Sequence, residues 1–287
     1  MDAKRVNAKP VVSRKFEAIL DTVCSLRPMP VSVTRVLNIL DDPCSTAATI
    51  AFSIGLDQVL AAQVLRLANS ASMGYGQACA ALNDAVMRIG FERLRTLVMA
   101  AGVTGALSKR LVGYHLGDEY LWHHSLSVAK TTLWLGRQMR YPEPEEAYVA
   151  GLLHDMGKLV LDHYMRAEYR RAIEMVLQGR GTLSQIEERL FGIDHGGGGG
   201  LMASRWNFPV ALTDAICFHH APSLARIKQQ LAALVNTANA IAPEYRSSVP
   251  DRMRHAVHPE SLLILHVDEE QIKSMQEEVH AAEQNAV

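Results

Sequence analysis

The 287-residue sequence contains few cysteines and no long apolar segment. Its four cysteines are widely spaced and include no C-x-x-C pair, which excludes the usual pattern of a disulfide framework or a zinc knuckle. No stretch reaches the roughly 18 uninterrupted apolar residues that span a bilayer, and residues 1–15 lack the apolar core of a signal peptide. We therefore expect a cytoplasmic protein that does not enter a membrane and whose cysteines are small buried thiols.

The sequence also lacks an excess of charge of either sign. It has 29 Lys and Arg against 30 Asp and Glu, so no overall positive field attracts nucleic acid or an anionic membrane surface. No basic recognition helix stands out, and we do not expect a nucleic-acid partner. With 48% hydrophobic residues, the chain is typical of a folded protein with one large core or two modest ones.

Strand patterns are missing as well, because no alternating segments are joined by Asn-Gly or Asp-Gly turns. Apolar residues instead recur three and four positions apart, as in Leu60, Val64 and Leu67, with Asp57 placed to begin that helix. Clusters of turn-forming residues, the last of them at 113–118, predict about five short helices before residue 115. The sequence therefore predicts an all-α fold.

Histidine is abundant in the second half, since eleven of the twelve histidines follow residue 115. The strongest local pattern is His154-Asp155 within the segment 151–159, where a buried imidazole and a buried carboxylate would each need a partner. In helical projection His154 shares a face with the small residues 147, 150 and 151, and Asp155 lies about a quarter turn away. Both side chains can then face one cavity. The same projection turns His124 inward and His123 toward the surface.

Two more histidine motifs follow downstream. Asp194-His195 precedes five consecutive glycines at 196–200, which we expect to form a mobile connection, and His219-His220 ends a helical pattern. Imidazoles that converge with a carboxylate suit divalent Mn, Fe, Co or Zn, and two such ions a few ångströms apart would activate water and clamp a phosphate. Lys158 could then supply charge to a phosphate oxygen.

The residues alone leave simpler alternatives open. An inward histidine such as His124 can be a satisfied core residue, and a hydrogen-bonded His-Asp pair can be purely structural. His219 and His220 can simply complement the negative end of a helix.

In their order along the chain, these motifs resemble the HDOD family, the HD-related output domain proteins. The second half contributes Trp122-x-His124-Ser125, Gly151-Leu152-Leu153-His154-Asp155-Met156-Gly157-Lys158-Leu159, Glu187 or Glu188 before Phe191-Gly192-x-Asp194-His195, Trp206-x-x-Pro209, and His219-His220-x-Pro222. The first half contributes Leu26-x-Pro28-x-Pro30, Asp57 before Val64-Leu65-Arg66-Leu67-Ala68-Asn69-Ser70-Ala71, and Ala85-x-x-x-Ile89-Gly90. The resemblance covers residues 18–243, and so many short motifs in one order are more specific than the His-Asp pair alone.

The resemblance implies an all-α fold in which an N-terminal helical bundle packs on a C-terminal HD-like bundle. It divides the chain into a tail (1–17), an N-terminal subdomain (18–114), an HD-like subdomain (115–258) and a C-terminal tail (259–287). It also implies a bacterial signalling role, with no catalytic activity generally established for the family. In the related HD-GYP phosphodiesterases the lysine that corresponds to Lys158 contacts phosphate, and positions like the following are metal ligands: His124, His154, Asp155, His195, His219 and His220.

Two departures from the phosphodiesterase pattern stand out. Ala221-Pro222-Ser223 follow the last histidine pair, where those enzymes have a Gly-Tyr-Pro element. Asn239 stands where the superfamily has an Asp ligand, and a neutral amide holds a divalent ion less firmly than a carboxylate does. We therefore interpret Asn239 as a degenerate ligand position, in a site that either retains a divalent metal (Fe, Mn or Zn) or has become vacant.

From these patterns we predict a bacterial signal-transduction output or scaffold protein that is not catalytic. It would relay a regulatory input to a signalling partner such as a sensor kinase, a receiver or another regulatory protein. Two alternatives remain. One is a metal-dependent phosphohydrolase or phosphodiesterase acting on nucleotides or cyclic dinucleotides, and the other is a sensor that binds a nucleotide ligand or a metal without turnover.

Overall fold

The computed structural model describes residues 14–25, 29–69, 78–243 and 256–284. Within these ranges the regular structure is helical, apart from one isolated β-bridge between Leu111 and Leu116. The predicted all-α fold is therefore confirmed. Of the helices in the described ranges, none is long and apolar enough to cross a membrane.

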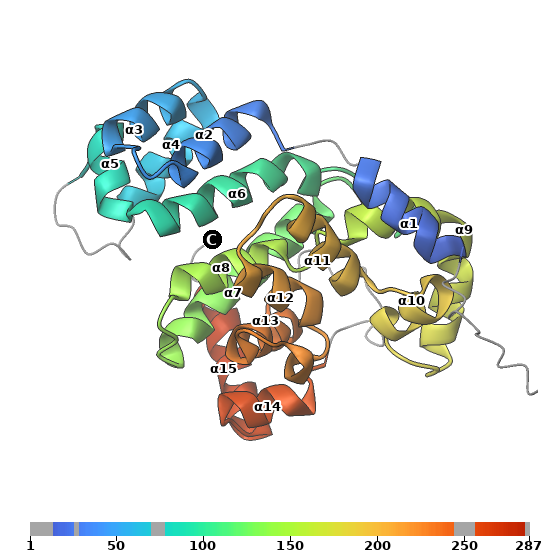
Figure 1. Cartoon of the computed structure of the whole chain (residues 1–287). Helices are drawn as coiled ribbons and strands as arrows, with labels where there is room; N and C mark the ends of the chain where they lie inside the picture. Colours follow the sequence, from blue (N-terminus) through green and yellow to red (C-terminus); the bar gives the residue numbers. More distant parts are fainter. Residues whose placement is uncertain (1–13, 26–28, 70–77, 244–255, 285–287) are drawn as a thin grey trace, which may run out of the picture.

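Among the described residues, five helices form the N-terminal bundle, and the long helix α6 is the last of them (Figure 1). Its members are α2 (Val31–Asp41), α3 (Ala47–Gly55), α4 (Gln58–Ala68), α5 (Leu82–Ile89) and α6 (Phe91–Leu107). Asp57 caps α4 as expected, because its carboxylate accepts hydrogen bonds from the backbone N–H groups of Val59 and Leu60 at 3.0 and 3.1 Å. Leu60 and Val64 of α4 are buried in the core.

The C-terminal bundle holds the histidine-rich half of the chain. Its members are α7 (Tyr120–Gln138), α8 (Pro144–Leu153), α9 (Lys158–Leu177), α10 (Leu183–Phe191), α11 (His195–Arg205), α12 (Val210–Phe218), the short 3₁₀ helix η2 (Pro222–Leu224) and α13 (Gln229–Ile241). The pair α7 and α8 packs closely, and so does the pair α11 and α12. The ends of these helices surround the site described below.

The first and last helices both pack on this C-terminal bundle. Helix α1 (Arg14–Ser25) contacts α9 and α11, although most of it belongs to the segment that we assigned to the N-terminal subdomain. Helices α14 (Pro259–Leu265) and α15 (Glu269–Gln284) contact α13 (Figure 1). The C-terminal bundle therefore draws on segments from both ends of the chain.

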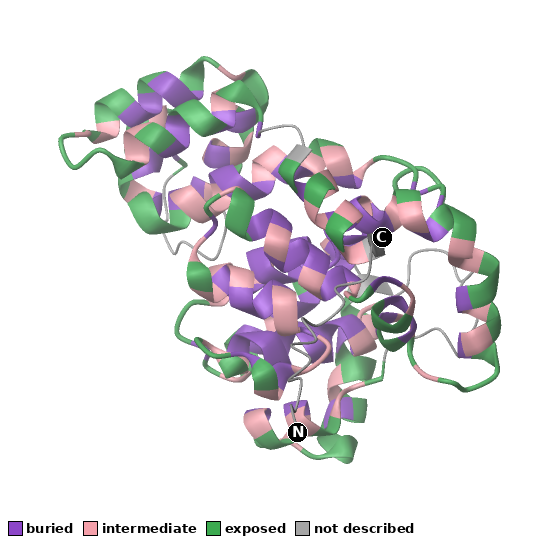
Figure 2. Ribbon diagram, turned by 45° about the vertical axis from the view of Figure 1, so that its right-hand side comes forward, coloured by how far each residue is buried: buried purple, intermediate pink, exposed green. Residues whose placement is uncertain are grey.

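The two bundles share one continuous hydrophobic core (Figure 2). Helix α6 contacts α2, α4 and α5 in its own bundle, and α7 and α8 in the other. Its Leu94 and Val98 are fully buried, as is Leu153 at the end of α8. The predicted packing of an N-terminal bundle on a C-terminal HD-like bundle is confirmed.

The cysteines are free, but not all of them are buried. Cys79 is buried and Cys217 is half-buried, whereas Cys24 and Cys44 are exposed. The expectation of buried thiols is therefore wrong for these two. Cys44 lies in the turn between α2 and α3, and Cys24 lies on the exposed side of α1, where packing does not reach.

Candidate metal centre

The fold brings the six predicted ligands together from four separate places. His124 lies on α7, His154 and Asp155 follow α8, His195 begins α11, and His219 and His220 follow α12. They form two groups, in each of which the possible ligand atoms lie within 4.8 Å of one another: His124 with His154 and Asp155, and His195 with His219 and His220. The His154 and His219 rings, one from each group, have centroids 5.1 Å apart, so the two groups adjoin.

The carboxylate of Asp155 lies between the two groups. Its Oδ1 is 3.2 Å from Nε2 of His195, and its Oδ2 is 3.4 Å from Nε2 of both His124 and His154. Asp155 is fully buried. A single carboxylate thus faces imidazoles from α7, from the end of α8 and from the start of α11.

Backbone carbonyls set the tautomers of two of the histidines. Nδ1 of His154 donates to the carbonyl oxygen of Gly151, and Nδ1 of His219 donates to that of Ile216, each at 2.8 Å. In its neutral form each ring then carries its lone pair on Nε2, which is the arrangement of a histidine prepared to bind a metal.

The lone pairs prepared in this way have no hydrogen-bond donor. Nε2 of His154, Nε2 of His219 and Oδ1 of Asp155 are all buried and have no hydrogen-bond partner among the residues that the structure describes. Buried polar atoms are almost always paired, because leaving one unpaired is destabilising. Two imidazole nitrogens and a carboxylate oxygen are the donors that suit a divalent transition metal, so these residues fit such an ion.

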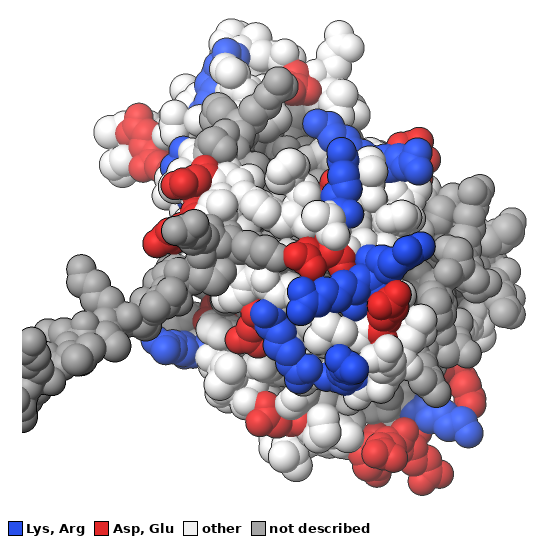
Figure 3. All heavy atoms as spheres, turned by 90° about the vertical axis from the view of Figure 1, so that its right-hand side faces the viewer, with Lys and Arg blue, Asp and Glu red and all other residues white. Residues whose placement is uncertain are grey.

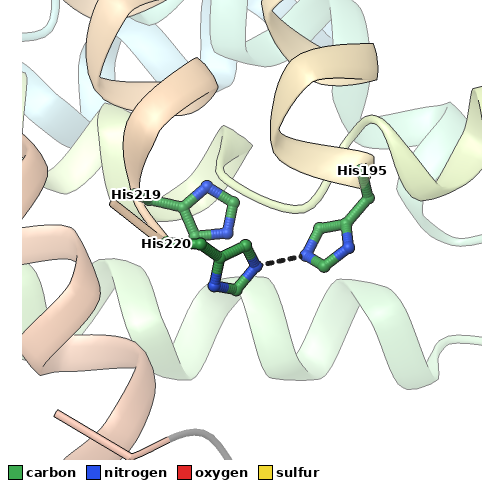
Figure 4. A group of neighbouring side chains, drawn as sticks. All are labelled: His195, His219 and His220. Carbon is green, nitrogen blue, oxygen red and sulfur yellow. Dashed lines mark hydrogen bonds between the residues drawn. The ribbon is translucent and has the colours of Figure 1, made fainter. Parts of the chain in front are cut away.

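The buried carboxylate of Glu187 fixes the orientation of His195 through Nδ1, on the side of the ring away from Asp155. Oε2 of Glu187 accepts hydrogen bonds from Nδ1 of His195 at 2.6 Å and from the His195 backbone N–H at 2.9 Å. The hydroxyl of Tyr114 donates to the other oxygen of Glu187 at 2.8 Å. Nε2 of His195 is thereby turned toward Asp155 and toward Nε2 of His220, which is 2.7 Å away (Figure 4).

The family resemblance places Glu187 or Glu188 in a motif, but the sequence indicates no role for either. Glu187 is fully buried, and its neighbour Glu188 is exposed. The sequence feature that could have identified Glu187 is its distance along the chain from His195. Glu187 lies on the buried side of α10, and α10 ends shortly before His195. Tyr114 lies in the segment before α7, and no local pattern connected it with the site.

Burial keeps two of the imidazoles neutral. It lowers the pKa of His124, and it lowers the pKa of His219 well below the usual histidine value. For His219 the neighbouring His154 and His195 act in the same direction, since a positive charge there opposes protonation. Neutral imidazole is the form that binds a metal.

Neighbouring groups of opposite charge shift the pKa values of His195 and Asp155 at the centre of the site. Burial alone would lower the pKa of His195, but the charge of Glu187, its hydrogen bond to the ring and the nearby Asp155 carboxylate outweigh it and raise that pKa to about 10. Burial alone would likewise raise the pKa of Asp155. The charges of His154 and Lys158 outweigh it and hold the Asp155 pKa well below its usual range.

The model of the HDOD domain family matches residues 26–222, which include all six candidate ligands. The chain belongs to the HDOD domain family. It is 28% identical to the solved structure of a candidate phosphohydrolase from Shewanella amazonensis, with a TM-score of 0.64 over 92% of this chain and 93% of that one. It is 26% identical to an HDOD domain protein of unknown function from Geobacter sulfurreducens, with a TM-score of 0.57 over 92% of this chain and 97% of that one.

Curated relatives of this HDOD chain are longer. A cyclic di-GMP phosphodiesterase of Pseudomonas aeruginosa is 28% identical over 152 residues, which cover 50% of this chain and 33% of that protein. A protein of Treponema pallidum with no assigned function is 24% identical over 256 residues, which cover 83% of this chain and 47% of that protein. The chain thus spans from a third to about half of the length of these relatives.

In this HDOD protein, Lys158 contacts the carboxylate at the centre of the cluster. Its Nζ donates to Oδ2 of Asp155 at 2.5 Å, and its side chain is 8% exposed. Asn239 is buried on α13, and within the described part of the chain its Oδ1 has no hydrogen-bond partner. The phosphate-binding role of Lys158 and the degenerate-ligand role of Asn239 stay predictions.

His154 and Asp155 do not lie inside a helix, so that expectation is wrong. Helix α8 ends at Leu153 and α9 begins at Lys158, which leaves the pair in the turn between them. Gly157 lets this turn approach α11, because a Cβ atom there would overlap the carbonyl oxygen of His195. The turn therefore lies directly against the start of α11.

The glycines at 196–200 do not form a mobile connection, which corrects a second expectation. They lie in the first turns of α11, which Asp194 caps by accepting a hydrogen bond from the Gly197 N–H at 2.8 Å. A Cβ atom at Gly199 would lie 2.8 Å from Cγ2 of Ile216, and one at Gly200 would lie 2.8 Å from Cβ of Cys217. The glycines therefore let α11 approach α12 closely, and this approach carries His195 to His219 and His220.

Proposed function

We propose that this chain is a non-catalytic signalling module of the HDOD type, in which the His–Asp cluster binds a divalent cation and a partner protein reads the state of the fold. The observation that carries the proposal is the closed form of the cluster. His154, Asp155, His195 and His219 are fully buried, and the ammonium group of Lys158 lies against Asp155. Such burial leaves little room for water and substrate, whereas hydrolytic metal sites keep a coordination position open for them.

The cation would be held by donor atoms from both groups of residues. His124, His154 and Asp155 form one set, His195, His219 and His220 the other, and the mixture of imidazole and carboxylate favours Fe, Mn or Zn. When bound, such an ion supplies positive charge to the unpaired Nε2 and Oδ1 atoms. The residues of this chain orient the donors, through Glu187 behind His195 and through carbonyls behind His154 and His219.

The partner in this proposal is a signalling protein, such as a sensor kinase, a receiver or another regulatory protein, and the setting is the cytoplasm. Within this chain we assign residues 18–114 to an N-terminal subdomain and residues 115–258 to an HD-like subdomain, which contains every candidate ligand. On the face drawn in Figure 3, Lys and Arg lie interspersed with Asp and Glu, a distribution that favours a protein partner over nucleic acid.

Metal-dependent hydrolysis of a nucleotide or cyclic dinucleotide is the second candidate function. Six candidate ligands favour it, because each is a residue that can bind a metal, although Asn239 replaces the Asp expected at a further position. A relative with 28% identity is named as a cyclic di-GMP phosphodiesterase. In that case Lys158 would have to leave Asp155 to reach a phosphate oxygen.

Elemental analysis of protein purified without chelator tests the proposal, together with a hydrolysis assay on a panel of nucleotides and cyclic dinucleotides. We expect bound Fe, Mn or Zn in the wild type, no hydrolysis, loss of the metal in His154→Ala, and retention of it in His163→Ala. His163 is the matched control because it is exposed on α9 and outside the cluster. Metal-free wild-type protein would contradict the proposal, and turnover that Asp155→Ala abolishes would establish the alternative.

A further inference from the structure

The backbone carbonyl of His219 is held by a residue outside the cluster. Nδ2 of Asn236, on α13, donates to the His219 carbonyl oxygen at 2.9 Å, and Asn236 is buried. That carbonyl belongs to the rigid peptide plane that joins His219 to His220. The ring of His219 is held separately, by its hydrogen bond to the Ile216 carbonyl. The hydrogen bond from Asn236 therefore fixes the backbone from which the side chains of His219 and His220 extend.

The other end of the same amide binds the first turn of α14. Oδ1 of Asn236 accepts hydrogen bonds from the backbone N–H of His258 and from the hydroxyl of Ser261, each at 2.8 Å. His258 caps α14, and Ser261 is fully buried. Two donors at Oδ1 and a carbonyl at Nδ2 allow only one orientation of the amide.

A second contact attaches α14 near the same place. Oγ of Ser223, in η2 just after the histidine pair, donates to the carboxylate of Glu260. Helix α14 therefore contacts both the segment that follows His220 and the helix that carries Asn236. In Figure 1, α14 lies at the bottom of the view, below α13, which it contacts.

Asn236, Ser223 and α14 lie outside the part of the chain that the family model matches, because that match ends at residue 222, whereas His219 and His220 lie inside it. We propose that Asn236 is a positioning residue that links the docking of α14 to the placement of His219 and His220. The inference rests on the proposed metal site for its function and on the hydrogen bonds of Asn236 for its geometry. Displacement of α14 by a partner would then loosen one of the two ligand groups.

The main test replaces the amide with a carboxylate. Asn236→Asp keeps an acceptor for His258 and Ser261, but it loses the donor to the His219 carbonyl and sets a carboxylate oxygen against it. With Co²⁺ as the probe, we expect about tenfold weaker binding and an altered visible absorption spectrum, since mutations behind metal ligands typically cost 10- to 100-fold in affinity. Unchanged affinity and spectrum would overturn the inference.

Asn69→Asp is the matched control. The Asn69 amide makes the same kind of bonds, since Nδ2 donates to the Cys79 carbonyl at 2.8 Å and Oδ1 accepts from the Cys79 N–H at 2.6 Å, but both lie in the N-terminal bundle. Asn69 is exposed whereas Asn236 is buried, so this variant should lose less stability, and it should keep the wild-type affinity and spectrum for Co²⁺. If both variants weaken Co²⁺ binding equally, Asn236 acts only through stability and the inference is wrong.

Ser261→Ala tests the link to α14 and does not require Asn236 to be changed. It removes one of the two bonds that attach α14 to the amide, and we expect Co²⁺ binding to weaken by a few-fold, less than in Asn236→Asp. Wild-type affinity in this variant would overturn the link to α14.

A measurement without metal separates this inference from the proposed function. In metal-free protein, the imidazole nitrogen resonances of His219 and His220 should shift in Asn236→Asp, while those of His163 should not. If the wild type binds no Co²⁺ but these resonances shift, the metal proposal fails and the positioning role stands. If they do not shift, the positioning role fails, whatever the wild type binds.

Discussion

Glu187 shows how a single buried residue can set the chemistry of a cluster. It accepts two hydrogen bonds from His195 and one from Tyr114, so its carboxylate is fully engaged on the side away from the donor atoms. The types of the six candidate ligands were readable from motif spacing. The residues that support these ligands by hydrogen bonds could not be predicted in this way. Tyr114 and Asn236, for example, come close to the ligands only in the folded chain.

Replacement of Glu187 with Gln should weaken metal binding by about 10- to 100-fold. The amide cannot supply the negative charge that orients His195 and makes it a better ligand. Competition titration with a chromophoric chelator measures the affinity. Glu188→Gln is the control, because Glu188 is the exposed neighbour on the same helix; equal losses in the two variants would show that Glu187 has no special role.

His195 should make the stability of the metal-free protein depend on pH. Its pKa is raised to about 10 in the folded protein, from about 6.5 in an unfolded chain. The folded state therefore binds the proton more tightly, so this contribution to stability is complete below about pH 6.5 and is lost as the pH rises through 10. Urea unfolding at several pH values measures the effect, and Glu187→Gln should flatten it. A stability that rises from pH 7 to pH 10 would contradict the assignment.

At the scale of elements, the glycine-rich helix was the main failure of prediction. Five consecutive glycines normally disfavour a helix, because each loses more backbone entropy than alanine on folding. Here tertiary packing outweighs that preference, since α11 can approach α12 this closely only without side chains at Gly196, Gly199 and Gly200. Helices with ordinary periodicity, such as α4, were predictable because their apolar face and their cap agree.

Gly157→Ala should destabilise the protein strongly, by about 2 kcal/mol or more, because the new methyl group meets the backbone of α11. Its backbone φ of −66° suits alanine, so the effect would come from space alone. Gly105→Ala is the opposite case, because Gly105 is exposed in α6 with nothing within 4 Å of the added atom. That change should stabilise the protein by about 0.5 to 1 kcal/mol. Urea unfolding compares the two, and a tolerated Gly157→Ala would disprove close contact at this turn.

For the whole molecule, the site joins segments that lie far apart in the sequence. Its candidate ligands come from α7, from the α8–α9 turn, from the start of α11 and from the end of α12. Local periodicity predicted helices for this half, but it carried no information on which helix ends would meet. The packing of α1 on α9 and α11 could not be predicted for the same reason. An amphipathic pattern shows which face of a helix is buried but not which helix covers it.

A bound divalent cation should therefore stabilise the entire fold. An ion that binds only the native state adds about 2.7 kcal/mol at a concentration of 100 times its Kd, which for a chain of this size raises Tm by about 5 to 10 °C. Thermal unfolding of chelator-treated protein, before and after addition of Zn²⁺ or Mn²⁺, measures the shift. His154→Ala should abolish it and His163→Ala should not. Because the two bundles share one core, the whole transition should move as a unit; a shift confined to part of a split transition would mean that the N-terminal bundle unfolds independently of the site.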